Sequence, residues 1–224
     1  MKKFSLSLLV YTVLLIPYHA AFAQLQMLRD QGTGNPVMAN PYPEVKGTPY
    51  WMEFGMGSII FSERDTASNL VIAFNAFNHT LVYQMDRDLM AYSPGKVNGF
   101  ILGRGPNAQV FRTGYMVPGI GPNRFVEVLV DGDYTLVNHK FKKIVDDPGA
   151  TYGSQRSKVF QNAEDLIVYK DGEAFVWRAR KKNLEGFFGV DGYKKLKDLS
   201  NSYGLDLKEK SDVRRLIMLL NNGN

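Results

Sequence analysis

The sequence predicts a mainly β protein of the α+β class: an antiparallel β-sandwich or incomplete barrel with two short C-terminal helices packed on it. Short apolar runs rich in Val, Ile, Tyr and Phe follow one another from Gly57, and polar turns such as "ERDTAS" and "MDRD" separate them. Such spacing indicates antiparallel strands. Two Asp-Gly pairs join further runs of this kind. After residue 180 the apolar residues recur at threes and fours, which is typical of helices.

The first 23 residues have the parts of a secretory signal peptide. Two lysines precede the apolar run Phe4 to Ile16, and small residues follow at Ala21 and Ala23. The run is too short for a spanning helix, which needs about 20 apolar residues. We therefore expect cleavage before Gln24, export to the periplasm or cell surface, and no transmembrane segment after processing. Because the chain has no Cys, we do not expect a lipoprotein.

Residues 24 to 56 are predicted to form an extended N-terminal arm. The stretch "GTGNPVMANPYPEVKGTP" is rich in Gly, Pro and Asn and has no period that could bury one face. The aromatic cluster "PYWMEF" contains two candidate binding residues, Tyr50 and Trp51. Docking of this cluster onto the core is the favoured interpretation, with a platform for a ligand as the alternative.

Residues 57 to 180 are predicted to form the antiparallel β domain. Its two clearest hairpins are expected at Asp131-Gly132 and Asp171-Gly172, because Asp-Gly accepts the positive φ angles of a two-residue turn. The second turn would place Lys170 opposite Glu173 as a cross-strand charge pair.

The Gly- and Pro-rich stretch from Gly103 to Arg124 is expected to be a long loop with at most one short strand. It lacks the Gly-Lys-Ser/Thr of a phosphate loop, and it completes no G-x-G-x-x-G before a helix. Long loops on a β scaffold often form binding surfaces. We therefore expect this loop to contribute to contacts with a partner.

Residues 181 to 224 are predicted to form a helical segment packed on the β domain. In "YKKLKDLSNSY" the apolar residues have helical spacing, and Gly204 lies where such a helix would end. Ser211 is expected to cap a second helix. The apolar stripe of that helix consists of Val213, Leu216, Ile217 and Leu220. Helices of about eleven residues are marginal alone in water, so both need a surface to pack on.

Basic residues are concentrated at the C-terminus. Residues 24–176 hold 14 Lys and Arg against 16 Asp and Glu, whereas residues 177–224 hold 11 against 6. The candidate residues for contact with an anionic surface are Arg178, Arg180, Lys181 and Lys182, of which the two arginines are expected on one face of a strand. A solvated strand end is the favoured alternative. Nucleic acid is not an expected partner of an exported protein.

The sequence offers few groups for catalysis, and it predicts no cofactor and no metal site. Only His79 and His139 would remain after processing, without the ligand spacing that zinc requires. His139 is expected to be a structural residue at the sheet rim. No G-x-S-x-G nucleophile turn is present. Glu127 is the most prominent candidate for a general acid, because the turn at Asp131-Gly132 would place it opposite Leu136 on a face that could be covered. An exposed or paired Glu127 is the favoured alternative.

The order of these segments resembles a family of exported Gram-negative envelope proteins. The residues that carry the resemblance are "YSPGKVNGFIL", "FVEVLVDGDYTLVNHKFKKI", "VWRARKKNLEGFF" and "YKKLKDLSNSYGLDLKEKSDVRRLIMLLNN", roughly residues 56 to 222. The resemblance implies export and a β-rich domain with short C-terminal helices. It implies no catalytic residues.

Together these features predict a non-catalytic exported protein that binds or supports another envelope component, either a protein or a glycan. One alternative is a carboxylate-dependent hydrolase that acts on an envelope glycan or peptide and uses Glu127 or another carboxylate. Another is binding to an anionic lipid or glycan surface through the basic C-terminal segment.

Overall fold

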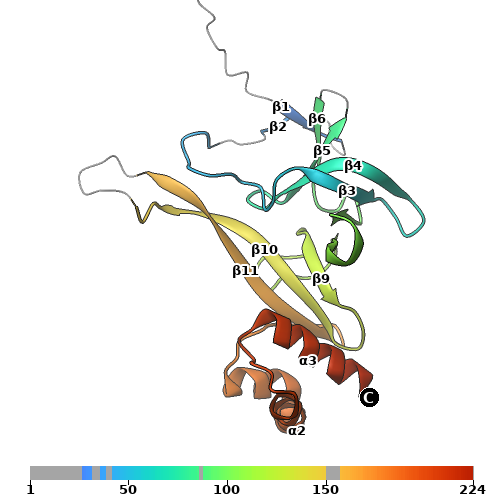
Figure 1. Cartoon of the computed structure of the whole chain (residues 1–224), viewed down its shortest axis with the longest axis vertical. Coiled ribbons are helices and arrows are strands. Elements are labelled where there is room, and N and C mark those ends of the chain that lie inside the picture. Colours follow the sequence, from blue (N-terminus) through green and yellow to red (C-terminus); the bar gives the residue numbers. More distant parts are fainter. Residues whose placement is uncertain (1–26, 32–35, 39–41, 86–87, 150–156, 224) are drawn as a thin grey trace, which may run out of the picture.

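The computed structural model describes residues 27–31, 36–38, 42–85, 88–149 and 157–223 (Figure 1). The predicted signal peptide and its cleavage site lie outside this part of the chain. The elements are β1 (Met27–Asp30), β2 (Pro36–Met38), β3 (Gly55–Ile60), β4 (Thr66–Asn75), β5 (Thr80–Met85), β6 (Asp88–Tyr92), β7 (Gly99–Leu102), η1 (Gly105–Asn107), β8 (Gln109–Arg112), β9 (Val126–Val130), β10 (Thr135–Asp146), β11 (Lys158–Lys170), β12 (Glu173–Val176), α2 (Lys181–Tyr203) and α3 (Lys210–Asn222).

The strands form one open sheet in the order β12-β11-β10-β9-β8-β7-β3-β4-β5-β6-β1-β2. Neighbouring strands are antiparallel except β1 and β6, which are parallel. The sheet does not close into a barrel, since β12 and β2 end the order. The prediction of a mainly antiparallel β fold with two C-terminal helices is therefore confirmed.

A long β10–β11 hairpin connects the two ends of the molecule (Figure 1). The two strands pair from Thr135 opposite Tyr169 to Asp146 opposite Lys158. Figure 1 shows β3 to β6 near one end of this hairpin and both helices at the other. The sequence predicted the flanking hairpins β9–β10 and β11–β12, but not this long pairing between them.

One hydrophobic core lies against strands β3, β4, β5, β7 and β8, which we call the upper part of the sheet. Its largest fully buried side chains include Ile59, Ile72, Phe74, Leu81, Phe100, Phe111 and Phe125. The Phe74 ring lies 5.2 to 6.1 Å from the rings of its three phenylalanine neighbours, measured between centroids. Each fully buried side chain of this size contributes about 1.5–3 kcal/mol. This core therefore gives the upper part a rigid frame.

A second core lies between the two helices and one face of the part of the sheet formed by β9 to β12. The four predicted stripe residues of α3 are all buried there, together with Val130, Leu136, Val168 and Trp177 of the sheet side. The Trp177 indole Nε1 donates a hydrogen bond to the Leu207 carbonyl at 2.8 Å. The predicted packing of the helical segment on the β domain is therefore confirmed.

The helix ends agree with the sequence at one position and differ at another. Gly204 follows α2 with a φ of 62°, as predicted, and α2 itself is interrupted at Gly189, which has non-helical angles. The expected cap at Ser211 is wrong. Helix α3 begins at Lys210 after Glu209, so Ser211 already lies inside the first turn. The chain enters α3 through a turn in which the Asp206 amide donates to an Asp212 carboxylate oxygen.

The β11–β12 turn has the predicted conformation. Asp171 and Gly172 have φ values of 51° and 83°, as a two-residue hairpin turn of this kind requires. Lys170 and Glu173 lie opposite each other across the pair. Both details follow from the local sequence alone.

The two-residue turn predicted at Asp131-Gly132 is wrong. Val130 pairs with Leu136, which leaves a wider turn, and a bulge follows between Leu136 and Val137. Glu127 consequently lies opposite Asn138 instead of Leu136. The wider turn is held by Asn221 of α3, whose amide side chain bonds both the N–H and the carbonyl of Tyr134 at 2.9 Å.

Candidate functional site

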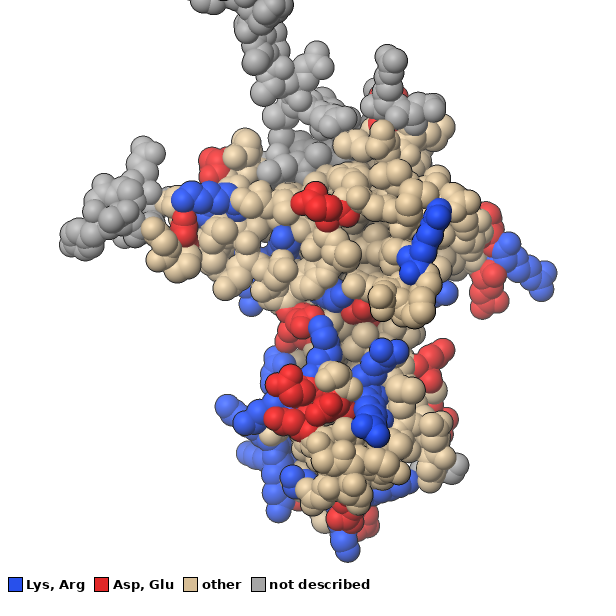
Figure 2. All heavy atoms as spheres, in the orientation of Figure 1, with Lys and Arg blue, Asp and Glu red and all other residues tan. Residues whose placement is uncertain are grey.

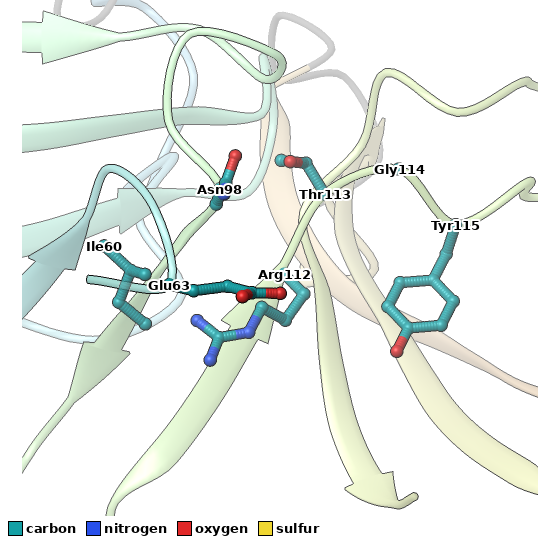
Figure 3. Close-up of a pocket in the computed structure, with 7 residues that line it drawn as sticks. All are labelled: Ile60, Glu63, Asn98, Arg112, Thr113, Gly114 and Tyr115. Carbon is teal, nitrogen blue, oxygen red and sulfur yellow. The ribbon is translucent and has the colours of Figure 1, made fainter. Parts of the chain in front are cut away.

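Three hollows with shared lining residues lie around the place where β8 and β9 separate, and we call them together the β9 groove. The largest, about 550 Å³, is lined by Ile60, Glu63, Asn98, Arg112, Thr113, Gly114 and Tyr115 (Figure 3). The second, about 330 Å³, is lined by Val110, Arg112, Tyr115 and residues 128–131. The third, about 250 Å³, is lined by residues 129–131 together with Arg214, Met218, Asn221 and Asn222 of α3. Shared lining residues make the three hollows contiguous.

The groove exists because β8 and β9 separate. They pair only at Phe111 with Glu127 and at Arg112 with Val126. Beyond that point, in the described part of the chain, β9 pairs only with β10, so the side of residues 128–130 that faces β8 is open. The Arg214 Nε donates a hydrogen bond to the Leu129 carbonyl at 3.2 Å on this side. The gap between the strands becomes the middle of the groove.

The upper wall is built from the ends of β3, β7 and β8. The Asn98 N–H donates to the Ile60 carbonyl at 2.8 Å, and the Thr113 N–H donates to the Asn98 carbonyl at 3.1 Å. Gly99 permits the close approach of β7 to β8, since a Cβ there would lie 2.0 Å from the Phe111 carbonyl oxygen. These backbone contacts hold the wall in place without a bound ligand.

Arg112 is the most unusual group in the groove. Its Nη1 is buried and has no hydrogen-bond partner among the described residues. Figure 3 shows the side chains of Arg112 and Glu63 extending into the largest hollow, with Tyr115 on its far side. Burial raises the pKa of the Tyr115 hydroxyl, and so does Asp131, while Arg112 acts in the opposite direction. The phenol is therefore a neutral hydrogen-bonding group at neutral pH.

The candidate residues Tyr50 and Trp51 lie against the upper sheet. Tyr50 is half-buried, forms a bridge to Asn75, and has its ring 5.2 Å from that of Phe54. Burial raises the pKa of the Tyr50 hydroxyl. The Trp51 N–H donates to the Phe74 carbonyl at 2.8 Å. The aromatic part of the predicted arm is thus docked on the core, as the favoured interpretation had it.

The four basic candidates lie at and before the start of α2. Arg178 pairs with Asp165 at 3.0 Å, and Lys181 pairs with a glutamate one turn along the helix at 3.4 Å. Arg180 and Lys182 are exposed. Strand β12 ends at Val176, so the two arginines do not share a strand face, which corrects that expectation. Figure 2 shows acidic and basic side chains interspersed over the helical end of the molecule.

Glu127 belongs to a buried ion-paired network outside the groove. It is 8% exposed, and its Oε2 lies 2.9 Å from the Lys140 Nζ. The Asn138 amide donates to Glu127 at 3.4 Å and to Glu164 at 2.7 Å. Lys210 of α3 pairs with Glu164 at 2.8 Å. Burial would raise the pKa of Glu164, but its bonds to Asn138 and Lys210 hold it below its usual value. The network thus fastens α3 and β11 to the strand that carries Asn138.

The two histidines form a buried stacked pair. His139 is 1% exposed within β10, so the prediction of a position at the sheet rim is wrong. Its ring lies 5.1 Å from that of His79 and 4.9 Å from that of Phe141. Burial lowers the pKa of His79 to about 3 and that of His139 to about 4. Both rings are therefore neutral at pH 7.

The described residues show no metal centre and no membrane-crossing helix. Within them, no group of three or more His, Asp or Glu side chains could hold a metal ion. None of the helices described is both long and apolar enough to cross a membrane. Comparison of the chain with family models, curated proteins and solved structures gave no match.

The sequence indicated part of the groove and missed the rest. The predicted loop from Gly103 to Arg124 supplies β8 and much of the wall, including Tyr115. The sequence does not single out Arg112, because no local pattern marks an arginine with a guanidinium nitrogen that becomes buried. The residues of α3 join the site only through the tertiary fold.

Proposed function

We propose that this protein is exported and acts by contact, binding or supporting another component of the cell envelope without catalysing a reaction. The β9 groove is its contact surface. The observation that carries the proposal is the groove itself: three contiguous hollows with preformed walls and a buried arginine nitrogen that has no partner among the described residues.

Rigid walls support this proposal. Phe111 and Val126, which flank the point where the strands separate, are fully buried. The Tyr169 hydroxyl donates to the Met116 carbonyl at 3.0 Å and ties the loop to β11. A preformed site binds without the cost of ordering its own loops. The groove is therefore suited to stable contact with a partner.

The test is affinity capture from detergent-solubilised envelopes with three forms of the protein lacking residues 1–23. Val110→Trp fills the middle hollow, and the triple variant Arg178→Gln, Lys181→Gln, Lys182→Gln removes basic charge while leaving the groove intact. Thermal melting checks that each form is folded. We expect the wild type and the triple variant to capture the same component, and Val110→Trp to lose it.

Two results would replace this proposal with one of its alternatives. Loss of capture in the triple variant alone would favour binding to an anionic surface. Turnover of an envelope glycan or peptide that disappears in a folded Glu127→Gln variant would favour the hydrolase. Capture that is unaffected by Val110→Trp would rule out the groove as the contact surface.

A further inference from the structure

We propose that the occupant of the β9 groove is an extended polypeptide segment with a carboxylate that pairs with Arg112. This inference rests on the proposed function and adds the chemical class of the partner. Three observations lead to it: the alternation of charge along the groove, the state of the Arg112 guanidinium, and the open side of β9.

The charges of the groove alternate along its length. Glu63 lies in the largest hollow, Arg112 is shared by the first two, Asp131 is shared by the second and third, and Arg214 lies in the third. A polyanion such as lipopolysaccharide would bring phosphates close to two carboxylates, and like charges in contact are unfavourable. A polypeptide can present both signs, so the alternation favours a protein partner over a polyanionic one.

The Arg112 guanidinium selects a carboxylate. A buried N–H donor without an acceptor is unfavourable, and the Arg112 Nη1 is such a donor among the described residues. A carboxylate accepts two parallel hydrogen bonds from the planar guanidinium. A ligand carboxylate in the two hollows that Arg112 lines would therefore pair with the accessible edge of this partly buried guanidinium.

The open side of β9 suits an extended backbone. Leu129 is the extra residue at the register shift opposite Leu136 and Val137, and its carbonyl accepts a hydrogen bond from the Arg214 Nε. A carbonyl oxygen has two lone pairs and can accept a second donor. The Arg214 side chain protects this edge from unselective pairing, while a segment entering the gap can still add as a short strand.

The walls then supply side-chain contacts. Val110 and Val128 face the middle hollow from its two strands, and the Tyr115 ring lies where the first two hollows meet. Apolar walls of this kind accept β-branched or aromatic side chains, which also favour the extended conformation. The ligand predicted is thus a run of such residues with one Asp or Glu.

The test is selection of a displayed library of random twelve-residue peptides on the protein lacking residues 1–23, followed by binding of the synthetic winners. We expect the winners to share an Asp or Glu within a β-branched or aromatic run. Arg112→Gln should weaken their binding at least about tenfold, and Arg112→Lys should retain part of it. Arg104→Gln, an exposed arginine bonded to Asn69, is the matched control and should bind as the wild type does.

Several outcomes would overturn the inference. They are winners without an acidic residue, equal affinity of a folded Arg112→Gln variant, failure to select any peptide, and displacement of the winners by lipopolysaccharide. The proposed function fails separately. It is contradicted if the Val110→Trp variant still captures the envelope component. If capture depends on the groove but peptide selection gives no acidic winners, the proposed function stands and only this inference is lost.

Discussion

At the scale of single residues, the buried side chains of Lys140 and of the two histidines show two solutions, which are pairing in a network and a neutral state. Lys140 shows the first solution. Its ammonium contacts Glu127 at 2.9 Å and Gln109 at 2.9 Å, and it lies 5.1 Å from the centroid of the Trp51 ring. A buried cation with three such partners holds β8, β9, β10 and the docked arm together.

Replacing Lys140 by Met should destabilise the protein by about 3–5 kcal/mol, because Glu127 would remain buried without its cation. The double variant Lys140→Met, Glu127→Gln should recover much of that loss, since neither charge is then left alone. Urea unfolding of the wild type, both single variants and the double variant measures the coupling. Strictly additive effects would show that the pair does not interact.

The histidine pair shows the second solution and predicts a pH dependence. The folded-state pKa values of about 3 and about 4 lie below the usual 6.5, so the unfolded chain binds these protons more readily. Stability is therefore complete above about pH 6.5 and falls as the pH drops toward 4, by about 1.4 kcal/mol per pH unit for each histidine. Asp165, which favours the charged form of His139, and Arg124, which opposes it, modulate this fall.

In the His139→Phe variant, unfolding at low pH should take up one proton fewer than in the wild type. A phenyl ring can keep the stacking on Phe141 and His79 and leaves no ring nitrogen unpaired. Between pH 6.5 and 4.5 the free energy of unfolding should fall less steeply in the variant than in the wild type. The reason is that the variant takes up about one proton fewer when it unfolds. Denaturant titrations at several pH values measure the slope. Equal slopes in the two proteins would mean that His139 is not held neutral.

At the scale of elements, α3 is an integral part of the fold. Leu216 on its inner face is fully buried, whereas Met218 on its outer face is 45% exposed. Leu216→Asp should destabilise the whole domain by at least about 3 kcal/mol, because it buries a charge and removes core contacts. Met218→Asp is the control on the same helix and should cost less than about 1 kcal/mol. An unchanged melting temperature of Leu216→Asp would mean that α3 is a separate docking helix.

The end of α3 also sets the shape of the β9–β10 turn. Asn221 satisfies both backbone groups of Tyr134. Asn221→Ala should therefore cost about 1–3 kcal/mol, while the exposed neighbour Asn222 should tolerate Ala within about 0.5 kcal/mol. Thermal melting compares the two variants. Equal melting temperatures would show that the turn holds its shape without α3.

Local sequence predicts elements where local forces decide them. The Asp171-Gly172 turn was predicted correctly, since its positive φ angles depend on those two residues. The same dipeptide at Asp131-Gly132 misled, because a side chain about ninety positions away holds a wider turn there. The apolar stripe of α3 was predicted from spacing alone and is buried as expected.

At the scale of the whole molecule, the fold class was predictable and the strand order was not. Short β-branched runs predict strands, but the pairing of β3 with β7, or of β10 with β11 along its full length, depends on contacts across the chain. The groove belongs to this second kind of feature. It arises where β8 and β9 separate, so only its loop, and not Arg112 or α3, could be anticipated from the sequence.

We propose the β9 groove as the surface through which the protein contacts its envelope partner. Photo-crosslinking in intact cells tests it most directly, with a photoreactive residue at the exposed groove position Asn98 or, as a control, at Val190, which is 72% exposed on α2 and lines none of the three hollows. We expect a discrete protein adduct from position 98 that disappears with Arg112→Gln, and none from position 190. An adduct from position 190 alone, or one from position 98 that persists in the folded Arg112→Gln variant, would contradict it.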